Sequence, residues 1–365
     1  MLYVKVGVDV GSVSWVGVWG EAETVTTWSP SEVEAPVLRS ISKLIFSSEK
    51  VEVVRLDATV AHHRYSSGGC KEIFAFPVHS QSTNSVLCRK KLFGTNPYSY
   101  CFVLKEIELI PFNLDECIVA PVAFVVITDD CSMAPKLYSA LSDVSGHNPR
   151  LVEEFEKILG QQVEANEPPL LAGELWFSLQ MRSLLPEIVV TVLVALLMEI
   201  KVMISSEWQS KRAECVLGIV GILASSMLPW PHPVLASPPG EIARELAHAP
   251  TPVFGAVSSR SSFPPDCLVV NADVGLIVSG LSKDLESAVS EFSERMPKFR
   301  QEVVDLEFIQ SMHKRISEVV VSLSELGGSM PFKERAKLIE ERFPTSPLYV
   351  AVFKSQAFQL RCDLI

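Results

Sequence analysis

The sequence lacks an excess of basic residues. Its 365 residues carry 32 Lys and Arg against 43 Asp and Glu, a formal net charge of −11 at pH 7. Nucleic acids and anionic membrane surfaces bind clustered Lys and Arg. The composition therefore argues against either of them as the primary partner, while 48% apolar residues are enough for a large core.

Paired-cysteine motifs are also missing. The eight cysteines form no CxxC and no spacing typical of metal ligands, and several stand inside apolar runs: Cys70, Cys88, Cys101, Cys117, Cys131, Cys215, Cys267 and Cys362. This pattern predicts reduced thiols buried as small apolar side chains in a cytosolic protein, in preference to a disulfide framework.

No apolar run is long enough to cross a membrane. The longest uncharged helix candidate, 215–228, is about a third shorter than the roughly 20 residues that a span needs, and Pro229, Pro231 and Pro233 stop it. The first residues, MLYVKVGVDVGS, alternate and carry Lys5 and Asp9, so they predict a strand in place of a signal peptide. We therefore expect no transmembrane segment.

The chain has no GxSxG elbow, P-loop or HExxH motif, and the adjacent His62 and His63 point to different faces of any regular element. We expect no catalytic, cofactor-binding or metal-ligating residues and no cofactor. One minor alternative remains, since VGVDVGSVSWVGV (6–18) and a second DVG at 273–275 resemble the phosphate hairpins of actin-like ATPases and sugar kinases. The last residues, CDLI, formally satisfy a prenylation pattern, which leaves lipidation of Cys362 open.

The first part of the chain predicts strands mixed with helices. Strands are expected at 2–10, 14–19, 51–60, 73–78, 98–109 and 117–128, and helices at 30–47, 132–142 and 148–162, the last with Asn148 as N-cap. Residues 62–69 are expected to form a loop and 78–97 a hairpin or loop. The strand at 117–128 is too uniformly apolar to have a wet face.

ANEPPLLAG (165–173) is the clearest linker, and the pattern after it alternates strands and helices. Strands are expected at 176–179, 199–205, 253–257 and within 267–278, and helices at 186–198 and 206–228, where Ser206 and Gln209 make a capping box. This alternation predicts a largely parallel sheet covered on both faces. From Lys283 onward we expect only helices, with an apolar stripe through Val303, Val304, Phe308, Met312, Ile316, Val319 and Leu323.

A longer combination is more specific. Residues 195–259 contain Leu196, Leu197 and Glu199 at a helix end, an aliphatic strand at 202–206, a long helix that ends in Leu228–Trp230, the strand Val234–Leu235, and Ala249, Pro250, Pro252 and Gly255. LVVNADVG (268–275) follows. This order resembles the central segment of DENN domains. The flanking segments 101–108, 117–141 and 343–360 are similar to the upstream longin-like and terminal helical parts of that family.

The resemblance implies a division into three parts. Residues 1–165 would form the longin-like upstream α/β module, 166–281 a central three-layer α/β module with a mostly parallel sheet, and 282–365 a downstream all-helical module. Most matching residues are apolar and are expected in the core, so the motif identifies a fold better than it identifies functional residues.

The resemblance also implies a function. DENN proteins are typically guanine-nucleotide exchange factors for Rab GTPases in membrane trafficking and vesicle transport, which act by stabilising the nucleotide-free GTPase. The expected surface is the cleft between the longin-like and central modules, with Ser205, Ser206, Trp208 and Asp273 as GTPase-binding candidates. From the residues alone, Ser206 is equally a helix cap, Trp208 a core anchor and Asp273 a turn residue.

The alternative reading is a non-catalytic DENN scaffold or a subunit of a GTPase-regulating complex, with an adaptor or heterodimer partner. A GTPase-activating role would need an exposed arginine, for which Arg212 and Arg260 are candidates, although solvated surface is the simpler expectation for both. The resemblance implies a cytoplasmic protein recruited peripherally to vesicle or endomembrane surfaces.

Overall fold

The computed structural model describes residues 2–7, 19–20, 45, 51–52, 54–65, 71–79, 98–111, 113–128, 130–144, 150–164, 174–224, 253–256, 267–296, 303–326, 330–355 and 358–359. The described residues up to 164 belong to one compact unit, and those from 174 onward belong to a second. The predicted linker at 165–173, the predicted hairpin or loop at 80–97 and most of the predicted helix at 30–47 lie outside the described residues. The three-part division with boundaries at 165 and 281 stays a prediction.

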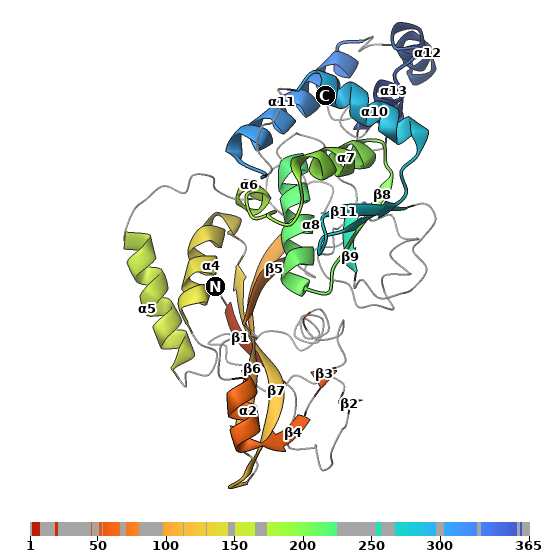
Figure 1. Ribbon diagram of the computed structural model, residues 1–365. Helices are drawn as coiled ribbons and strands as arrows, with labels where there is room; N and C mark the ends of the chain where they lie inside the picture. Colours follow the sequence, from red (N-terminus) through yellow and green to blue (C-terminus); the bar gives the residue numbers. More distant parts are fainter. Residues whose placement is uncertain are drawn as a thin grey trace. The chain divides into compact units, whose positions relative to one another are not determined.

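The first unit contains an antiparallel sheet of five strands (Figure 1). Its strands are β1 (Leu2–Gly7), β4 (Val54–Asp57), β5 (Glu72–His79), β6 (Tyr98–Pro111) and β7 (Glu116–Thr128), in the order β1-β7-β6-β5 with β4 also on β7. Two short strands, β2 (Trp19–Gly20) and β3 (Val51–Glu52), pair separately. In β7 the ten residues from Cys117 to Val126 are all buried, which confirms that this strand has no wet face.

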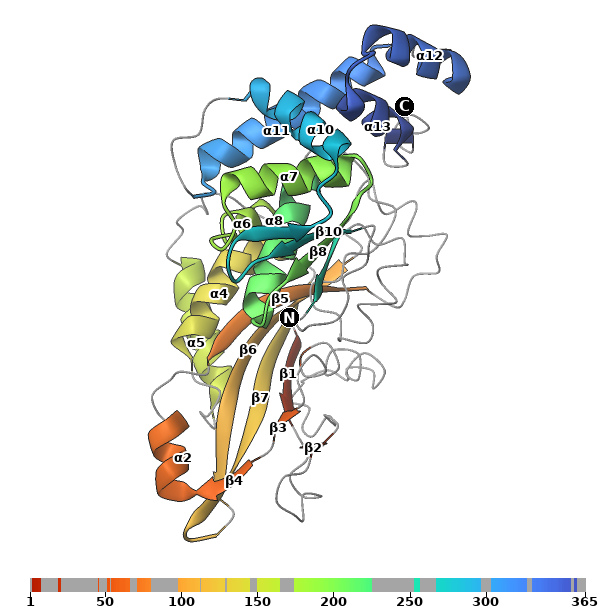
Figure 2. The same ribbon diagram turned by 45° about the vertical axis from the view of Figure 1, so that its right-hand side comes forward.

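Helices α4 (Ala134–Asp143) and α5 (Leu151–Glu164) lie on one side of the long strands β6 and β7 (Figure 2). The rings of Phe102 and Tyr138 meet edge to face at 5.9 Å, and those of Phe124 and Phe155 at 5.5 Å. Lys71 completes the end of α4, because its ammonium donates to the carbonyl oxygens of Ser142 and Val144 at 2.6 and 2.7 Å. Both helices were predicted within three residues of their observed starts.

The predictions of a continuous strand at 51–60 and of a loop at 62–65 are wrong, and the rest of the predicted loop, 66–69, lies outside the described residues. The strand ends at Asp57, and α2 (Ala58–Tyr65) begins there. The Asp57 carboxylate accepts hydrogen bonds from the amides of Thr59 and Val60 at 2.9 and 3.2 Å, which is how an aspartate caps a helix start. Ala61 then packs against Cys117 and Val119 of β7. This tertiary contact stabilises the helix although its sequence contains β-branched residues.

The second unit is built around a small mixed sheet in the order β11-β10-β8-β9. Strands β8 (Lys201–Ser205), β9 (Val253–Ala256) and β10 (Cys267–Asn271) run parallel, and β11 (Leu276–Ser279) returns antiparallel to β10. The predicted largely parallel sheet is thus present, with β11 added at one edge as an antiparallel hairpin strand. Gly280 has φ +91°, and a Cβ there would lie 2.3 Å from the Cys267 carbonyl oxygen, so only glycine fits.

Helices α7 (Pro186–Leu197) and α8 (Gln209–Ala224) contact β8, as Figures 1 and 2 show. Helix α7 begins at the predicted proline and all its residues except Glu187 are buried, which explains its almost uniformly apolar sequence. Residues 174–178 form helix α6 (Glu174–Ser178), and the predicted strand at 176–179 is wrong. Its Ser178 hydroxyl donates to the Gly218 carbonyl at 2.8 Å, because Gly218 lets α6 approach α8 closely.

The described residues after 282 are helical except for connections, as predicted: α10 (Lys283–Glu294), α11 (Leu306–Ser324), α12 (Phe332–Arg342) and α13 (Pro347–Lys354). The apolar stripe is buried from Val304 onward, but Val303 precedes the helix and is 55% exposed. Two buried arginines satisfy helix ends. Arg315 donates to the Phe292 carbonyl at 3.2 Å near the end of α10, and Arg335 donates to the Leu326 carbonyl at 3.1 Å after α11.

Within the described ranges, no helix combines the length and apolarity that a membrane crossing requires. Five of the cysteines are described, all as free thiols, and only Cys131 is not buried. Burial raises the pKa of Cys215 to about 12 and raises that of Cys101 further, so these thiols stay protonated and unreactive.

Candidate functional site

The candidate residues Ser205, Ser206, Trp208 and Asp273 come together at the carboxyl ends of the parallel strands β8 and β10. Strand β8 ends at Ser205 and β10 ends opposite it at Asn271, so the segments that leave both strands meet at one edge of the sheet. The Ala272 amide donates to the Ser205 carbonyl at 2.8 Å and extends this pairing by one step. In open α/β sheets, ligands bind outside this edge.

Asp273 connects the two segments. Its carboxylate accepts hydrogen bonds from the Ser206 hydroxyl at 2.7 Å and from the Glu207 amide at 2.8 Å. The Lys211 ammonium, on the first turn of α8, forms an ion pair with the same carboxylate at 3.3 Å. Asn271 orders the turn itself, since its side-chain oxygen accepts from the Asp273 amide at 2.8 Å. Asp273 is thus a turn residue that also clamps the start of α8.

The charge of Asp273 is stabilised by these contacts. Burial of the carboxyl works to raise its pKa, but the hydrogen bonds from Ser206 and Glu207 and the positive charge of Lys211 outweigh burial. Together they hold the pKa of Asp273 below its usual value of 3.8. The clamp is therefore fully charged at neutral pH.

Ser205 and Ser206 are fully buried beneath the surface. The Ser205 hydroxyl donates to the Val270 carbonyl at 3.2 Å, and the Ser206 hydroxyl accepts from the Trp208 amide at 2.9 Å. The helix begins at Gln209, so Ser206 orders the turn before α8 and is not the cap of a helix that starts directly after it. Both serines therefore hold the turn from beneath the surface. Direct contact with a partner is left to the more exposed residues of the site.

Arg212 is also buried, and the expectation that it lies on the solvated surface is wrong. Its Nη1 donates to the Ser206 carbonyl at 2.6 Å, so the guanidinium holds the turn from inside the unit. A side chain in this position cannot reach a bound GTPase as an arginine finger does. Arg260 lies outside the described residues.

Trp208 is the exposed member of the site. Its side chain is 58% exposed, although its backbone amide is bound by Ser206 and its carbonyl accepts from the Arg212 amide. The alternative of a core anchor is therefore wrong. A large aromatic side chain held at the surface by an ordered backbone is typical of a protein-binding position.

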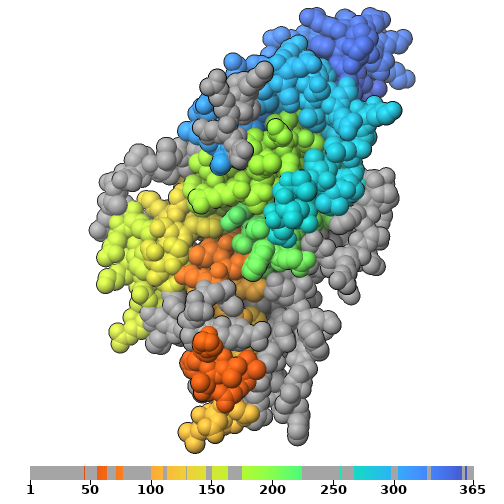
Figure 3. All heavy atoms as spheres, in the orientation of Figure 1, coloured from red at the N-terminus to blue at the C-terminus, as the bar shows by residue number. Residues whose placement is uncertain are grey.

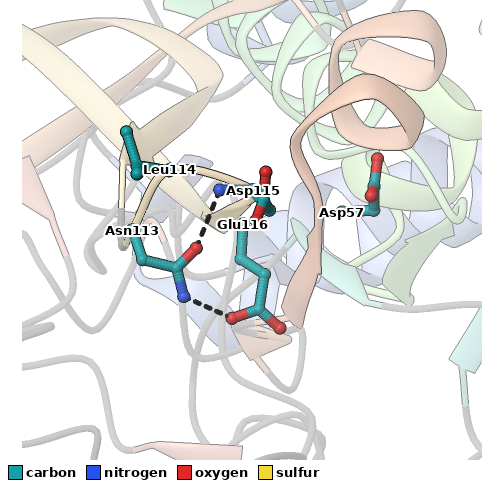
Figure 4. A pocket seen from close by; sticks show the side chains of 5 residues that line it. All are labelled: Asp57, Asn113, Leu114, Asp115 and Glu116. Atoms are coloured by element: carbon teal, nitrogen blue, oxygen red, sulfur yellow. Dashed lines mark hydrogen bonds between the residues drawn. The ribbon is translucent and has the colours of Figure 1, made fainter.

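A hollow of about 580 Å³ lies in the first unit at the tip of the β6–β7 hairpin (Figure 4). Three carboxylates line it, from Asp57, Asp115 and Glu116. The Asn113 amide donates to Glu116 at 2.6 Å, and the Asn113 oxygen accepts from the Asp115 amide at 2.9 Å. Asp57 is the cap of α2. Asn113 and Glu116 are thus used in forming the hairpin tip, and Asp57 in starting α2.

Among the described residues, no group of three or more His, Cys, Asp or Glu side chains is placed to hold a metal ion. Asp273, in the second DVG, is occupied by contacts within its own chain, and the first DVG (9–11) lies outside the described residues. Comparison with protein-family models gives no match, and comparison with curated proteins gives none either.

Sequence reasoning did not select Lys211 for this site, and it named Arg212 only as a candidate exposed arginine, a role that its burial excludes. Both residues lie in the first turn of α8, which is a weak signal, because Lys and Arg are common on any helix. The second DVG resembles a phosphate hairpin in sequence, but the contact of its Asp273 with Ser206 depends on the parallel register of β8 and β10.

Proposed function

We propose that this chain is a DENN-type guanine-nucleotide exchange factor, which binds a Rab-type small GTPase in its nucleotide-free state and so accelerates release of GDP. The observation that carries the proposal is Trp208, an aromatic side chain 58% exposed on a backbone that Ser206, Arg212 and Asp273 hold in place. Its sequence support is the DENN-like pattern at 195–275, whose described parts form α7 to β10 of the second unit.

Exchange requires no nucleophile, general base or cofactor in the factor itself. A protein that binds the nucleotide-free GTPase more tightly than the nucleotide-bound form must weaken nucleotide binding by the same ratio. What it needs is a preordered surface, because each side chain immobilised on binding lowers affinity. Trp208 supplies buried area with little loss of conformational freedom, and the partly exposed Lys211 and the exposed Glu207 supply polar contacts at its rim.

In this proposal the four candidate residues have different roles. Trp208 reaches the partner, whereas Asp273 clamps the start of α8 and Ser205 and Ser206 hold the turn from beneath. The longin-like identity of the first unit, the cleft between modules, and peripheral recruitment to vesicle or endomembrane surfaces belong to the same proposal and rest on the sequence resemblance.

The experiment is a GDP-release assay with a panel of purified Rab GTPases loaded with a fluorescent GDP analogue. We expect the chain to accelerate release from at least one member. Trp208→Ala should lower the exchange rate about 30-fold, as loss of an interface hot spot of about 2 kcal/mol does. The matched control is Val303→Ala, which truncates another exposed apolar side chain of the same unit, 55% exposed, away from this edge of the sheet.

The exchange rate of Val303→Ala should match that of the unaltered protein. The thermal midpoints of both variants should also be unchanged. If no Rab in the panel responds, the exchange proposal fails. If Trp208→Ala exchanges at the unaltered rate, the assignment of the surface fails. Capture of a nucleotide-free Rab without accelerated release would favour the scaffold alternative, and ATP binding in calorimetry would favour the actin-like one.

A further inference from the structure

Among the described residues, the small sheet of the second unit ends in β11, whose outer edge pairs with no other strand. Strand β11 is the last in the order β11-β10-β8-β9, and in the described part of the chain it pairs with β10 alone (Figure 1). The backbone groups of Leu276–Ser279 that point away from β10 therefore have no strand partner there. Such an edge is complementary to one kind of ligand, another extended chain that offers N–H and C=O groups at the same repeat.

Apolar side chains accompany this edge. Leu276 and Val278 are 59% and 49% exposed and stand two residues apart, so they project from the same face of the strand. Val274, before the strand, is 64% exposed, and Leu281, after it, is 48% exposed. Figure 3 shows atoms of the segment 267–296, in cyan, at the surface of this unit.

The segment also lacks the charged and proline guards of an edge strand. Edge strands normally carry Lys, other charges or Pro that prevent pairing with other chains. Residues 274–282, VGLIVSGLS, contain no charge and no proline in a chain that is 21% charged. An unguarded, apolar and uncharged edge is expected where pairing is functional.

We propose that β11 is a docking site for a short extended segment of a partner protein, which adds to the small sheet as a further strand. The segment places uncharged apolar side chains at every second position, against Leu276 and Val278. Its centre is uncharged because residues 274–282 offer no counter-charge, and an unpaired charge at such a contact is unfavourable.

The area of the site favours a short segment over a second copy of this chain. Complete burial of a Leu or Val side chain removes on the order of 60–120 Å² from water. Four such side chains, each about half exposed, therefore offer roughly 130–260 Å² of apolar surface. A stable dimer needs about 800 Å² from each partner. Strand addition depends less on area, because main-chain hydrogen bonds supply much of the affinity.

The test uses the full chain and an array of fluorescein-labelled heptapeptides. Each has Lys at both ends and Val, Ile, Leu or Phe alternating with Thr between them. We expect micromolar binding of at least one peptide, measured by fluorescence polarisation. The same peptide with N-methyl groups on alternate backbone amides should bind at least about tenfold more weakly in one of the two alternations, because each lost hydrogen bond weakens binding by about that factor.

Val278→Lys places a guard residue on the edge and should weaken peptide binding about tenfold with an unchanged thermal midpoint. Val303→Lys, at a 55% exposed position outside the sheet, is the matched control and should bind as the unaltered chain does. The proposal is overturned if no peptide binds at 1 mM, if both N-methylated peptides bind as well as the parent, or if Val278→Lys has no effect. Sedimentation that reveals a dimer abolished by Val278→Lys would instead assign the edge to a second copy. None of these outcomes depends on GDP release, so this proposal and the exchange proposal can fail separately.

Discussion

Asp273 joins two stretches of sequence that lie far apart, since its carboxylate binds the Ser206 hydroxyl and the Glu207 amide 67 and 66 residues earlier. The ion pair with Lys211 adds a third contact at 3.3 Å. Hydrogen bonds to a charged group stabilise a fold by about 1.5–3 kcal/mol each when they are well formed. At the scale of single residues, this carboxylate therefore stabilises the turn that carries Trp208.

Asp273→Asn should lower the free energy of unfolding at pH 7 by about 1–3 kcal/mol, because the amide loses the ion pair and cannot accept at both positions. The pKa of Asp273 lies below 3.8 in the folded chain, so its stabilising effect is present above about pH 4 and disappears as the pH falls through the lowered value. The difference between the two proteins should therefore shrink in acid.

Urea unfolding at pH 7 and at pH 3 measures both differences. Glu156→Gln is the matched control, because Glu156 is an exposed carboxylate in the middle of α5. The unfolding free energy of Glu156→Gln should stay within about 0.5 kcal/mol of that of the unaltered protein at both pH values. An Asp273→Asn difference that does not change with pH would contradict the charged clamp.

At the scale of helices and strands, two glycines have opposite environments. Gly160 lies inside α5, and a Cβ there would meet no atom within 4 Å. Gly280 follows β11 with φ +91°, and a Cβ there would lie 2.3 Å from the Cys267 carbonyl oxygen and 2.6 Å from the Leu268 Cα. The first glycine only weakens its helix, whereas the second permits the β10–β11 hairpin to lead into α10.

Gly160→Ala should raise the free energy of unfolding by about 0.5–1 kcal/mol, the difference in helix propensity between the two residues. Gly280→Ala should lower it by more than about 2 kcal/mol, since the added methyl meets backbone that cannot move aside and the φ angle is unfavourable for alanine. Thermal unfolding of the two variants checks both signs. Equal effects of the two substitutions would contradict the described hairpin.

Short elements were the main failure of sequence reasoning at this scale. Long, strongly patterned segments were predicted correctly, among them β6, β7, α7 and α11. Helices α2 and α6 were mistaken for strand or loop, because eight and five residues carry too little periodicity to outweigh local propensity. Their helical state depends on the Asp57 cap and on packing of α6 against α8.

At the scale of the whole molecule, the described residues form two compact units, each with its own core. The sheet of the first unit buries Phe102, Phe124 and their neighbours, and the second unit buries α7 together with β8 and β10. Separate cores of this kind usually unfold as separate cooperative units.

Differential scanning calorimetry should therefore resolve two transitions. Gly280→Ala should move only the transition of the second unit. Phe102→Ala, which leaves a cavity in the first unit, should move only the other, by several degrees for a loss of about 3–5 kcal/mol. A single transition that both variants shift equally would contradict the division.

The sequence alone determined the alternation of strands and helices, the apolar β7, the proline start of α7 and the small, mostly parallel sheet, because these follow from periodicity and local punctuation. It also singled out Ser205, Ser206, Trp208 and Asp273. Only the tertiary structure decided what these residues do: that the serines and Arg212 are buried supports, that Asp273 is a charged clamp and that Trp208 is exposed. The physical reason is the parallel register of β8 and β10, which brings residues about 67 positions apart into hydrogen-bond distance. No local pattern contains such a contact.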